Sequence, residues 1–277
     1  MPSPYADYHC LRVHCESGIT NVTFDHPPIN LLDLEMMTEL DRLGRELYDD
    51  ADVRVIVFDS ANPEFFIAHA DVELLLQLPK SDAERPREMN PFHVMVERFR
   101  TMPKVTIAKI EGIARGGGSE FALSLDMRFA ASGRAVLAQP EVAVGILPGG
   151  SGTQRLPRLM GRSRALEVIL GCGDFDAETA ERYGYVNRAL PADEIGGFVD
   201  ALATRVASFP ADAIRLAKIA TLAATELPIR EGLLEEAHCF NQTLALPEAK
   251  RRMRRFLELG GQTREIELEP AAVFNKL

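Results

Sequence analysis

A run of three glycines followed by a serine and a glutamate, Gly116 to Glu120, is the segment best suited to chemistry. Consecutive glycines are costly in backbone entropy, so the chain needs something there that only glycine permits. At the N-terminus of a helix, backbone N–H groups without intrahelical partners carry partial positive charge and can hold an oxyanion. A tight strand-to-helix turn with no ligand explains the glycines equally well, and both interpretations stay open on this run alone.

Two carboxylates follow in positions where they could share acid and base roles. Glu120 opens the helix predicted after the glycines, and Glu141 stands in Gln139-Pro140-Glu141, ahead of a loop rich in glycine and proline. Each has an ordinary explanation, as a first-turn acid that complements the helix dipole and as a solvated loop acid. Together near a helix N-terminus, they can divide acid and base catalysis if their surroundings separate their pKa values.

A third segment, Phe65 to Asp71, ends an aromatic run in small residues before a predicted helix. A strand exit with Asp71 as the N-cap explains it on propensity alone. The same small-residue exit could supply a second backbone donor to an oxyanion held at the glycine run.

Other kinds of site are not expected. The sequence lacks a Gly-Lys-Ser/Thr phosphate loop, a G-x-G-x-x-G run and a G-x-S-x-G elbow. Neither the four cysteines nor the six histidines show ligand spacing, so no metal is expected. A net charge of -10 argues against nucleic acid and anionic membranes as partners. With no apolar run of about 20 residues and a polar N-terminal segment, we expect a cytoplasmic protein.

Strands and helices alternate first, and helices dominate from Gly152 onward, which predicts an α/β class. The expected strands are a hairpin over 9–24 and runs at 53–58, 104–110, 128–131, 135–138 and 185–190. The expected helices are 34–47 with Asp33 as N-cap, 92–99, the stretch up to Leu125, 152–159, 162–170, 176–183, 192–207, 211–225 and 230–258. The polar segment 79–90 is expected to be a loop and a possible lid.

Together these segments resemble the crotonase (enoyl-CoA hydratase/isomerase) superfamily. The resemblance runs from Thr20 to Leu190, more loosely to Leu259, and is densest from Lys104 to Leu159. The matching motifs are Ile110-Glu111-Gly112, Gly116-Gly117-Gly118-Ser119-Glu120-Phe121-Ala122, Asp126, Gln139-Pro140-Glu141, Gly145-Ile146-Leu147-Pro148 and Gly152 to Arg158. So long an ordered set is far more specific than any one glycine run.

The resemblance implies an α/β fold of the ClpP/crotonase type, built from repeated ββα units. It implies a catalytic core over residues 1–190 and a C-terminal helical region, 191–277, that assembles a homo-trimer or a hexamer made as a dimer of trimers. The substrate implied is an acyl-CoA thioester, with no nucleic acid or membrane partner. No cofactor is implied, because CoA is part of the substrate, and no metal.

For the site, the resemblance implies an oxyanion hole formed by the N–H groups of Ala70 and Gly117. Glu141 would deliver a proton to Cα of a 2-enoyl-CoA, and Glu120 would position and deprotonate the water, giving a 3-hydroxyacyl-CoA. The remaining residues expected along the substrate and CoA are Ala68, His69, Asp71, Gly116, Gly118, Pro140 and Gly149.

Three alternatives to a hydratase stay open. A double-bond isomerase needs one proton shuttle, for which Glu141 suffices, and a thioester hydrolase is a weaker alternative. A non-catalytic acyl-CoA-binding protein also stays open, because His69 stands where the family usually has glycine. Glu73 replaces a lysine that many members carry, so we expect CoA affinity to differ from that of relatives.

Overall fold

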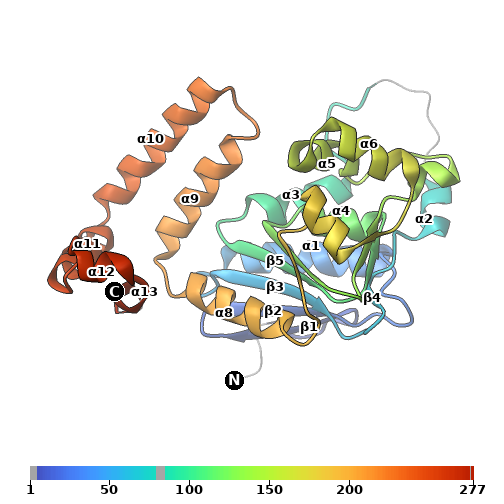
Figure 1. Cartoon of the computed structure of the whole chain (residues 1–277). Coiled ribbons are helices and arrows are strands. Elements are labelled where there is room, and N and C mark those ends of the chain that lie inside the picture. Colours follow the sequence, from blue (N-terminus) through green and yellow to red (C-terminus); the bar gives the residue numbers. More distant parts are fainter. Residues whose placement is uncertain (1–4, 79–84, 275) are drawn as a thin grey trace. The chain divides into compact units, whose positions relative to one another are not determined.

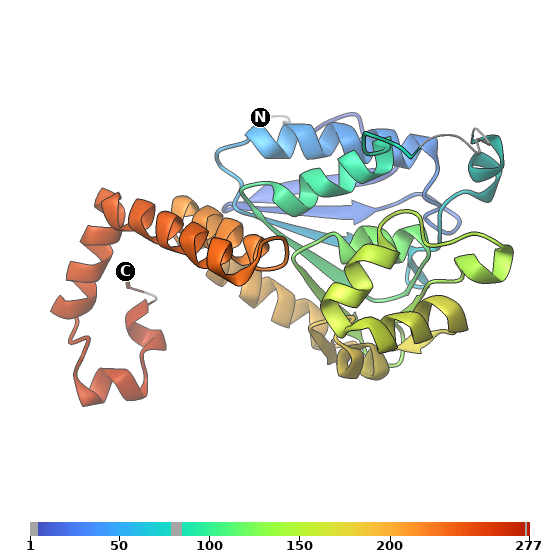
Figure 2. The ribbon, with the colours of Figure 1, turned by 90° about the horizontal axis from the view of Figure 1, so that it is seen from above.

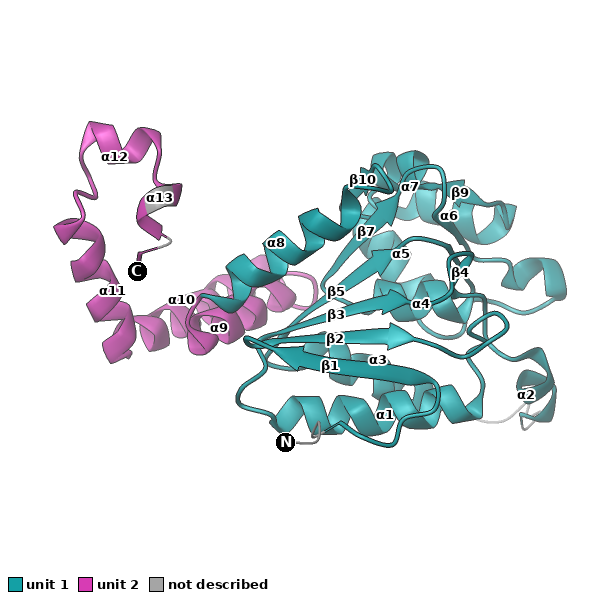
Figure 3. Cartoon of the chain, turned by 90° about the horizontal axis from the view of Figure 1, so that it is seen from below, with its two compact units in different colours: residues 1–208 teal, residues 209–277 magenta. Residues whose placement is uncertain are grey.

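The computed structural model describes residues 5–274, apart from 79–84, and residues 276–277 (Figure 1). The chain divides into two compact units, residues 1–208 and 209–277 (Figure 3). The predicted boundary at residue 190 therefore falls inside the first unit. Part of the predicted loop over 79–90 lies outside the described residues, and its last residue, Asn90, caps the helix that follows.

A six-stranded sheet forms the body of the first unit. Its strands, in spatial order, are β1 (Leu11–Glu16), β2 (Ile19–Phe24), β3 (Val55–Ser60), β5 (Val105–Ile110), β7 (Met127–Ala131) and β10 (Arg188–Leu190). β1 and β2 pair antiparallel, and each later neighbour pairs parallel. The hairpin predicted over 9–24 is thus confirmed, with positive φ at both Ser17 and Gly18, as a tight hairpin turn requires.

A smaller sheet contains β4 (Phe65–Ile67), β6 (Ile113–Arg115), β8 (Val136–Ala138) and β9 (Phe175–Asp176), in that order. β4, β6 and β8 run parallel, whereas β9 is antiparallel to β8. Each of β3, β5 and β7 in the large sheet is followed along the chain by a short strand of the small sheet. Two of these pairs lead directly into α2 (Val72–Gln77) and α4 (Gly117–Leu123), so the expected ββα unit repeats.

The two faces of the large sheet are covered by different helices, as the alternation along β3 requires. Ile56 and Phe58 point into a core shared with α1 (Leu34–Asp49) and α3 (Pro91–Thr101), which lie side by side on one face (Figure 2). Val55 and Val57 point to the other face and pack against α8 (Ile195–Ala207). This packing is why α8 belongs to the first unit.

The remaining helices of the first unit are η1 (Glu141–Val144, a 3₁₀ turn), α5 (Gly152–Met160), α6 (Arg162–Gly171) and α7 (Ala177–Tyr183). The second unit holds α9 (Ala211–Ala223), α10 (Ile229–Ala245), α11 (Pro247–Glu258), α12 (Arg264–Leu268) and α13 (Ala271–Phe274). The single helix predicted over 230–258 is wrong, because Leu246 is extended and Pro247 starts a new helix. Within the described residues, no helix is long and apolar enough to cross a membrane.

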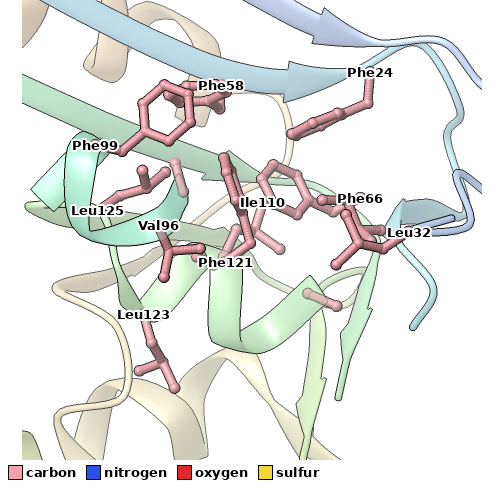
Figure 4. Packing of buried hydrophobic residues seen from close by; sticks show 14 of the residues in the cluster. Phe24, Leu32, Phe58, Phe66, Val96, Phe99, Ile110, Phe121, Leu123 and Leu125 are labelled. Carbon is pink, nitrogen blue, oxygen red and sulfur yellow. The ribbon is translucent and has the colours of Figure 1, made fainter. Parts of the chain in front are cut away.

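Five buried phenylalanines join α3, α4 and the two sheets (Figure 4). Phe121 of α4 lies at their centre, with ring centroids 5.7 Å from Phe24, 5.2 Å from Phe58 and 5.7 Å from Phe99, all edge to face. Phe66 of β4 packs against Phe24 in the same way, at 5.1 Å. Such pairs add to the energy of burying the rings, and they fix the short α4 against the sheet and so place its N-terminus.

Candidate active site

The glycine run connects β6 to α4 and is compressed between neighbouring segments. Gly116 has a φ of +49° and ψ of -124°, a conformation that other residues rarely adopt. A Cβ atom on Gly118 would lie 2.3 Å from the carbonyl oxygen of Ile67 in β4, so α4 packs on β4 through bare backbone. The turn and the close approach therefore both require glycine.

The amides of Ala70 and Gly117 lie next to one another at this turn. A Cβ atom on Gly117 would lie 3.3 Å from the nitrogen of Ala70. Leu32 pairs with the residues on either side of Ala70, since its N–H donates to His69 O at 2.9 Å and its carbonyl accepts from Asp71 N at 3.1 Å. Within the described part of the chain, neither the Ala70 amide nor the Gly117 amide donates to an acceptor. Two adjacent donors at a helix N-terminus can hold an oxyanion.

Glu120 lies in the first turn of α4 and is only 3% exposed. Its Oε1 accepts a hydrogen bond of 2.8 Å from the amide of Gly152, at the start of α5. Burial, and after it the charge of Glu141, raise the pKa of Glu120 to about 7. The amides of Gly152 and Gly150 and the charge of Arg155 act in the opposite direction and lower this pKa. A buried carboxyl that titrates near neutral pH is suited to proton transfer.

Glu141 begins η1 and is half-buried, and its burial raises the pKa of the carboxyl above the usual value. The side-chain nitrogen of Gln139 donates to both of its carboxylate oxygens, at 3.1 and 3.2 Å, and the amide oxygen accepts from Ser119 Oγ at 3.1 Å. This orientation of the amide is assigned because it satisfies both of its groups. Ser119 Oγ in turn lies 2.5 Å from the hydroxyl of the fully buried Tyr185. Ser119 and Tyr185 thus hold the Gln139 amide, and this amide fixes the position of the Glu141 carboxylate.

The other predicted site residues are dispersed around this centre. His69 and Glu141 both lie close to Gly116. The Nδ1 atom of His69 is 2.8 Å from the carbonyl oxygen of Ala70. Asp71 caps α2 by accepting from Glu73 N at 2.8 Å, as its type predicts. The backbone of Ala68 is used in bonds to Ile29 and Arg115. Pro140 precedes η1, and Gly149 is exposed on the loop before α5.

Several partners of the two glutamates were not found from the sequence. The Gly152 amide lies 32 residues beyond Glu120, and Tyr185 lies 66 residues beyond Ser119. Gln139 belonged to a quoted motif, but only the folded chain shows which atoms its amide contacts. No local pattern signals these contacts.

A second group of polar side chains lies at the open end of the β1–β2 hairpin. Ligand atoms of Cys10, His26 and Glu35 all lie within 4.8 Å of one another, because the hairpin register brings Cys10 beside His26. The spacing of these residues along the sequence does not signal this group, which only the folded chain brings together. Cys10 Sγ lies 3.3 Å from His26 Nδ1, and His26 Nε2 lies 2.7 Å from Asp33 Oδ2. Cys10 and His26 therefore each have a polar partner within the protein.

The two-sheet ββα architecture, with paired amides and paired carboxylates at one helix N-terminus, defines the crotonase fold class. The sequence model of the enoyl-CoA hydratase/isomerase family matches residues 14–263. The chain belongs to the enoyl-CoA hydratase/isomerase family.

Individual relatives agree with this assignment. The chain is 33% identical to the "Probable enoyl-CoA hydratase echA8" of Mycobacterium bovis over 252 residues, which is 91% of this chain and 96% of that protein. A Streptomyces avermitilis protein with a known crystal structure is 43% identical to this chain in sequence. The match covers 98% of both chains, and the TM-score is 0.73. DspI of Pseudomonas aeruginosa is 36% identical, with 93% of this chain and 97% of that chain covered and a TM-score of 0.84.

Proposed function

We propose that this protein catalyses the reversible hydration of a 2-enoyl-CoA thioester to a 3-hydroxyacyl-CoA. The observation that carries the proposal is the placement of the buried Glu120 and the half-buried Glu141 around the turn that presents the amides of Ala70 and Gly117, which have no acceptor among the described residues. This site contains the parts that the reaction needs, and the named hydratase relative supports the same reaction.

The amides would act on the carbonyl of the substrate. Adding water across the Cα=Cβ bond builds negative charge on the thioester oxygen, and donors aimed at that oxygen stabilise the transition state more than the ground state. Ala70 and Gly117 supply two such donors, and the N-terminus of α4 adds its partial positive charge. Loss of one such donor costs roughly 3–4 kcal/mol in other enzymes.

The carboxylates would carry the protons. Glu120 positions the water and takes a proton from it as oxygen bonds to Cβ, while Glu141 gives a proton to Cα. Burial raises the pKa of both carboxyls, and the charge of Glu141 raises the pKa of Glu120 further, so both bind a proton more readily than an ordinary glutamate does. One proton leaves the pair and one enters it, so the pair ends each turnover with the proton count at which it began.

We also propose that the protein assembles into trimers, or hexamers built from two trimers, through its second unit. Helix α10 exposes several large apolar side chains. Monomeric proteins rarely expose such side chains together, and a group of them marks an interaction surface. They are Ile229 at 79%, Leu233 at 56%, Leu234 at 59% and Phe240 at 60% exposure. Sedimentation equilibrium of the full chain measures the mass, and a monomer at micromolar concentration would contradict the proposal.

Hydration is tested with purified protein and a series of straight-chain 2-enoyl-CoA esters, by following loss of the conjugated thioester absorbance and identifying the product. We expect Glu120→Gln and Glu141→Gln each to lower kcat by about 10²–10⁴-fold, the usual contribution of a general acid or base. Glu178→Gln is the matched control, because Glu178 is also a first-turn glutamate of a short helix but is exposed.

The alternative activities give different results in the same assay. A displaced double bond with Glu120→Gln still active would identify an isomerase, and release of free CoA thiol a hydrolase. Tight acyl-CoA binding without turnover would identify a binding protein. Full rate in both glutamine variants would overturn the proposed mechanism.

A further inference from the structure

The loop that presents amides to Glu120 contains a strained residue. Ser151 has a φ of +113°, which residues other than glycine adopt rarely, and it stands between Gly150 and Gly152. The amides of both glycines act on the Glu120 carboxylate. The conformation of Ser151 therefore decides where these two donors point, and strain of this kind persists only where the surroundings impose it.

Arg155, one turn into α5, forms two hydrogen bonds to Ser151. Its Nε donates to Ser151 Oγ at 2.8 Å, and its backbone N–H donates to Ser151 O at 2.9 Å. The side chain is only 14% exposed, and the other end of the guanidinium pairs with Glu97 of α3. Glu97 also accepts from Arg100 Nε, at 3.0 and 2.9 Å.

The same helix, α3, contacts the loop at two further points. The ring of Phe92 would lie 2.6 Å from a Cβ atom on Gly150, and His93 Nε2 lies 2.8 Å from the carbonyl oxygen of Gly149. Buried Val96 and Phe99 fix α3 to the core. The loop is thus held between α3 and the first turn of α5, and the Glu97–Arg155 pair is the ionic contact between these two helices.

We propose that the Glu97–Arg155 ion pair is a positioning device for Glu120. It keeps Ser151 in its strained conformation, so that the amides of Gly150 and Gly152 face the carboxylate, and it places a cation near the Glu120–Glu141 pair. The kinetic part of this inference rests on the proposed hydration. Arg155 and Glu97 are positioning residues, since they act on the reaction through Ser151 and Glu120.

The groups facing these side chains fix the expected direction of the pH effect. Glu120 faces the charge of Glu141, the Tyr185 hydroxyl and Arg155, while Arg155 faces Glu97, Arg100 and Arg158. The charge of Arg155 lowers the pKa of Glu120, and so do the two amides. Loss of Arg155 removes the charge and loosens the amides, and both changes raise the pKa of Glu120.

The test compares Arg155→Gln, Glu97→Gln and the double variant with Arg158→Gln, a control on the exposed side of the same helix. We expect Arg155→Gln and Glu97→Gln to lower kcat about tenfold or more, with KM nearly unchanged, because small misplacements of catalytic groups can cost up to ~100-fold. The double variant loses no more than Arg155→Gln, since the two residues act as a unit. Because Glu120 must be ionised to accept a proton from water, the acid limb of kcat/KM for hydration moves upward in Arg155→Gln.

Arg155→Lys separates charge from geometry. Lysine keeps the cation but lacks the planar fork that reaches Ser151 and Glu97 together. We therefore expect it to restore the position of the acid limb but not kcat. Unchanged kinetics in Arg155→Gln and Glu97→Gln would overturn the proposal. So would a loss of thermal stability with an unmoved acid limb, since that indicates a purely structural ion pair.

A direct titration keeps this test independent of turnover. With ¹³C-labelled glutamate, the carboxyl resonance of Glu120 is identified by its absence in Glu120→Gln, and its pKa is followed in each variant. If the wild type does not hydrate enoyl-CoA, the proposed function fails. The positioning inference then stands or falls on whether Arg155→Gln raises this pKa and Arg158→Gln leaves it unchanged.

Discussion

The Oε1 atom of Glu141 lies 2.9 Å from the position that a Cβ atom on Gly116 would occupy. The first glycine of the run therefore leaves space for the carboxylate to which we assign the proton for Cα. The Cβ atom of His69 lies 3.7 Å from the same position. Each glycine of the run meets a different neighbour, so substitutions at the three positions have different consequences.

Gly116→Ala is expected to impair catalysis more than folding. The new methyl group displaces the Glu141 carboxylate, and we expect kcat to fall by roughly 100-fold, as for a misplaced catalytic group. The positive φ of Gly116 adds a stability loss of about 1–2 kcal/mol. Steady-state kinetics and denaturant unfolding of the same preparation measure both effects, and a normal kcat would show that Glu141 has other room to move.

Gly118→Ala is expected to impair folding itself. Its Cβ would lie 2.3 Å from the carbonyl oxygen of Ile67 and 2.7 Å from the Cβ of Ile67, and no rotamer change moves either of these atoms. We expect a loss of several kcal/mol in the free energy of unfolding, or insoluble protein. Gly133→Ala is the control, because Gly133 has a φ of +72° but nothing within 4 Å of the added atom. Gly133→Ala should lower the free energy of unfolding only by the cost of placing alanine at a positive φ, about 1–2 kcal/mol.

Phe121 is expected to be a sensitive aromatic residue of the core, because its ring packs edge to face against three others. Phe121→Ala should lower the free energy of unfolding by about 3–5 kcal/mol through lost burial and the cavity left behind. Tyr48→Ala, at a ring that is 47% exposed, serves as the control and should change it by less than about 1 kcal/mol. Equal effects of the two substitutions on the denaturation midpoint would contradict the central role of Phe121.

The sequence predicts the parts of this protein that depend on local pattern. The hairpin over 9–24 follows from alternation and a Ser17-Gly18 turn, and Asp33 caps α1 as its type predicts, with Oδ1 2.9 Å from Met36 N. The break at Leu246-Pro247 was also readable, since proline cannot continue a helix.

Contacts between distant segments could not be predicted in the same way. The apolar stripe of α8 predicts a helix but does not say that Val199 packs on Val55 of the large sheet. Likewise, the glycines around Ser151 predict a loop but not that its amides reach Glu120. Such contacts depend on how strands pair across the sheets, which periodicity alone does not encode.

Glu120 should make the folded state less stable at alkaline pH than at acidic pH. Its pKa is about 7 in the folded protein against a usual value of 4.5, so between these values the folded state binds a proton that the unfolded state has lost. Stability therefore falls as pH rises through this window, by about 3 kcal/mol once the pH exceeds the folded pKa. Glutamine in its place stays neutral and avoids this loss.

Glu120→Gln is accordingly expected to be a much slower enzyme but more stable than the wild type at pH 8, by up to about 3 kcal/mol. The difference should shrink as pH falls and vanish near pH 4.5, where the wild-type carboxyl is also neutral in the folded state. Urea unfolding of both proteins from pH 4.5 to 8.5 gives the difference directly, and the titrating groups that do not interact with Glu120 cancel because they are common to both. Glu178→Gln, at an exposed helix position, should show no such dependence. A wild type that is as stable as Glu120→Gln at pH 8 would mean that the buried carboxylate is better solvated or better paired than its surroundings indicate.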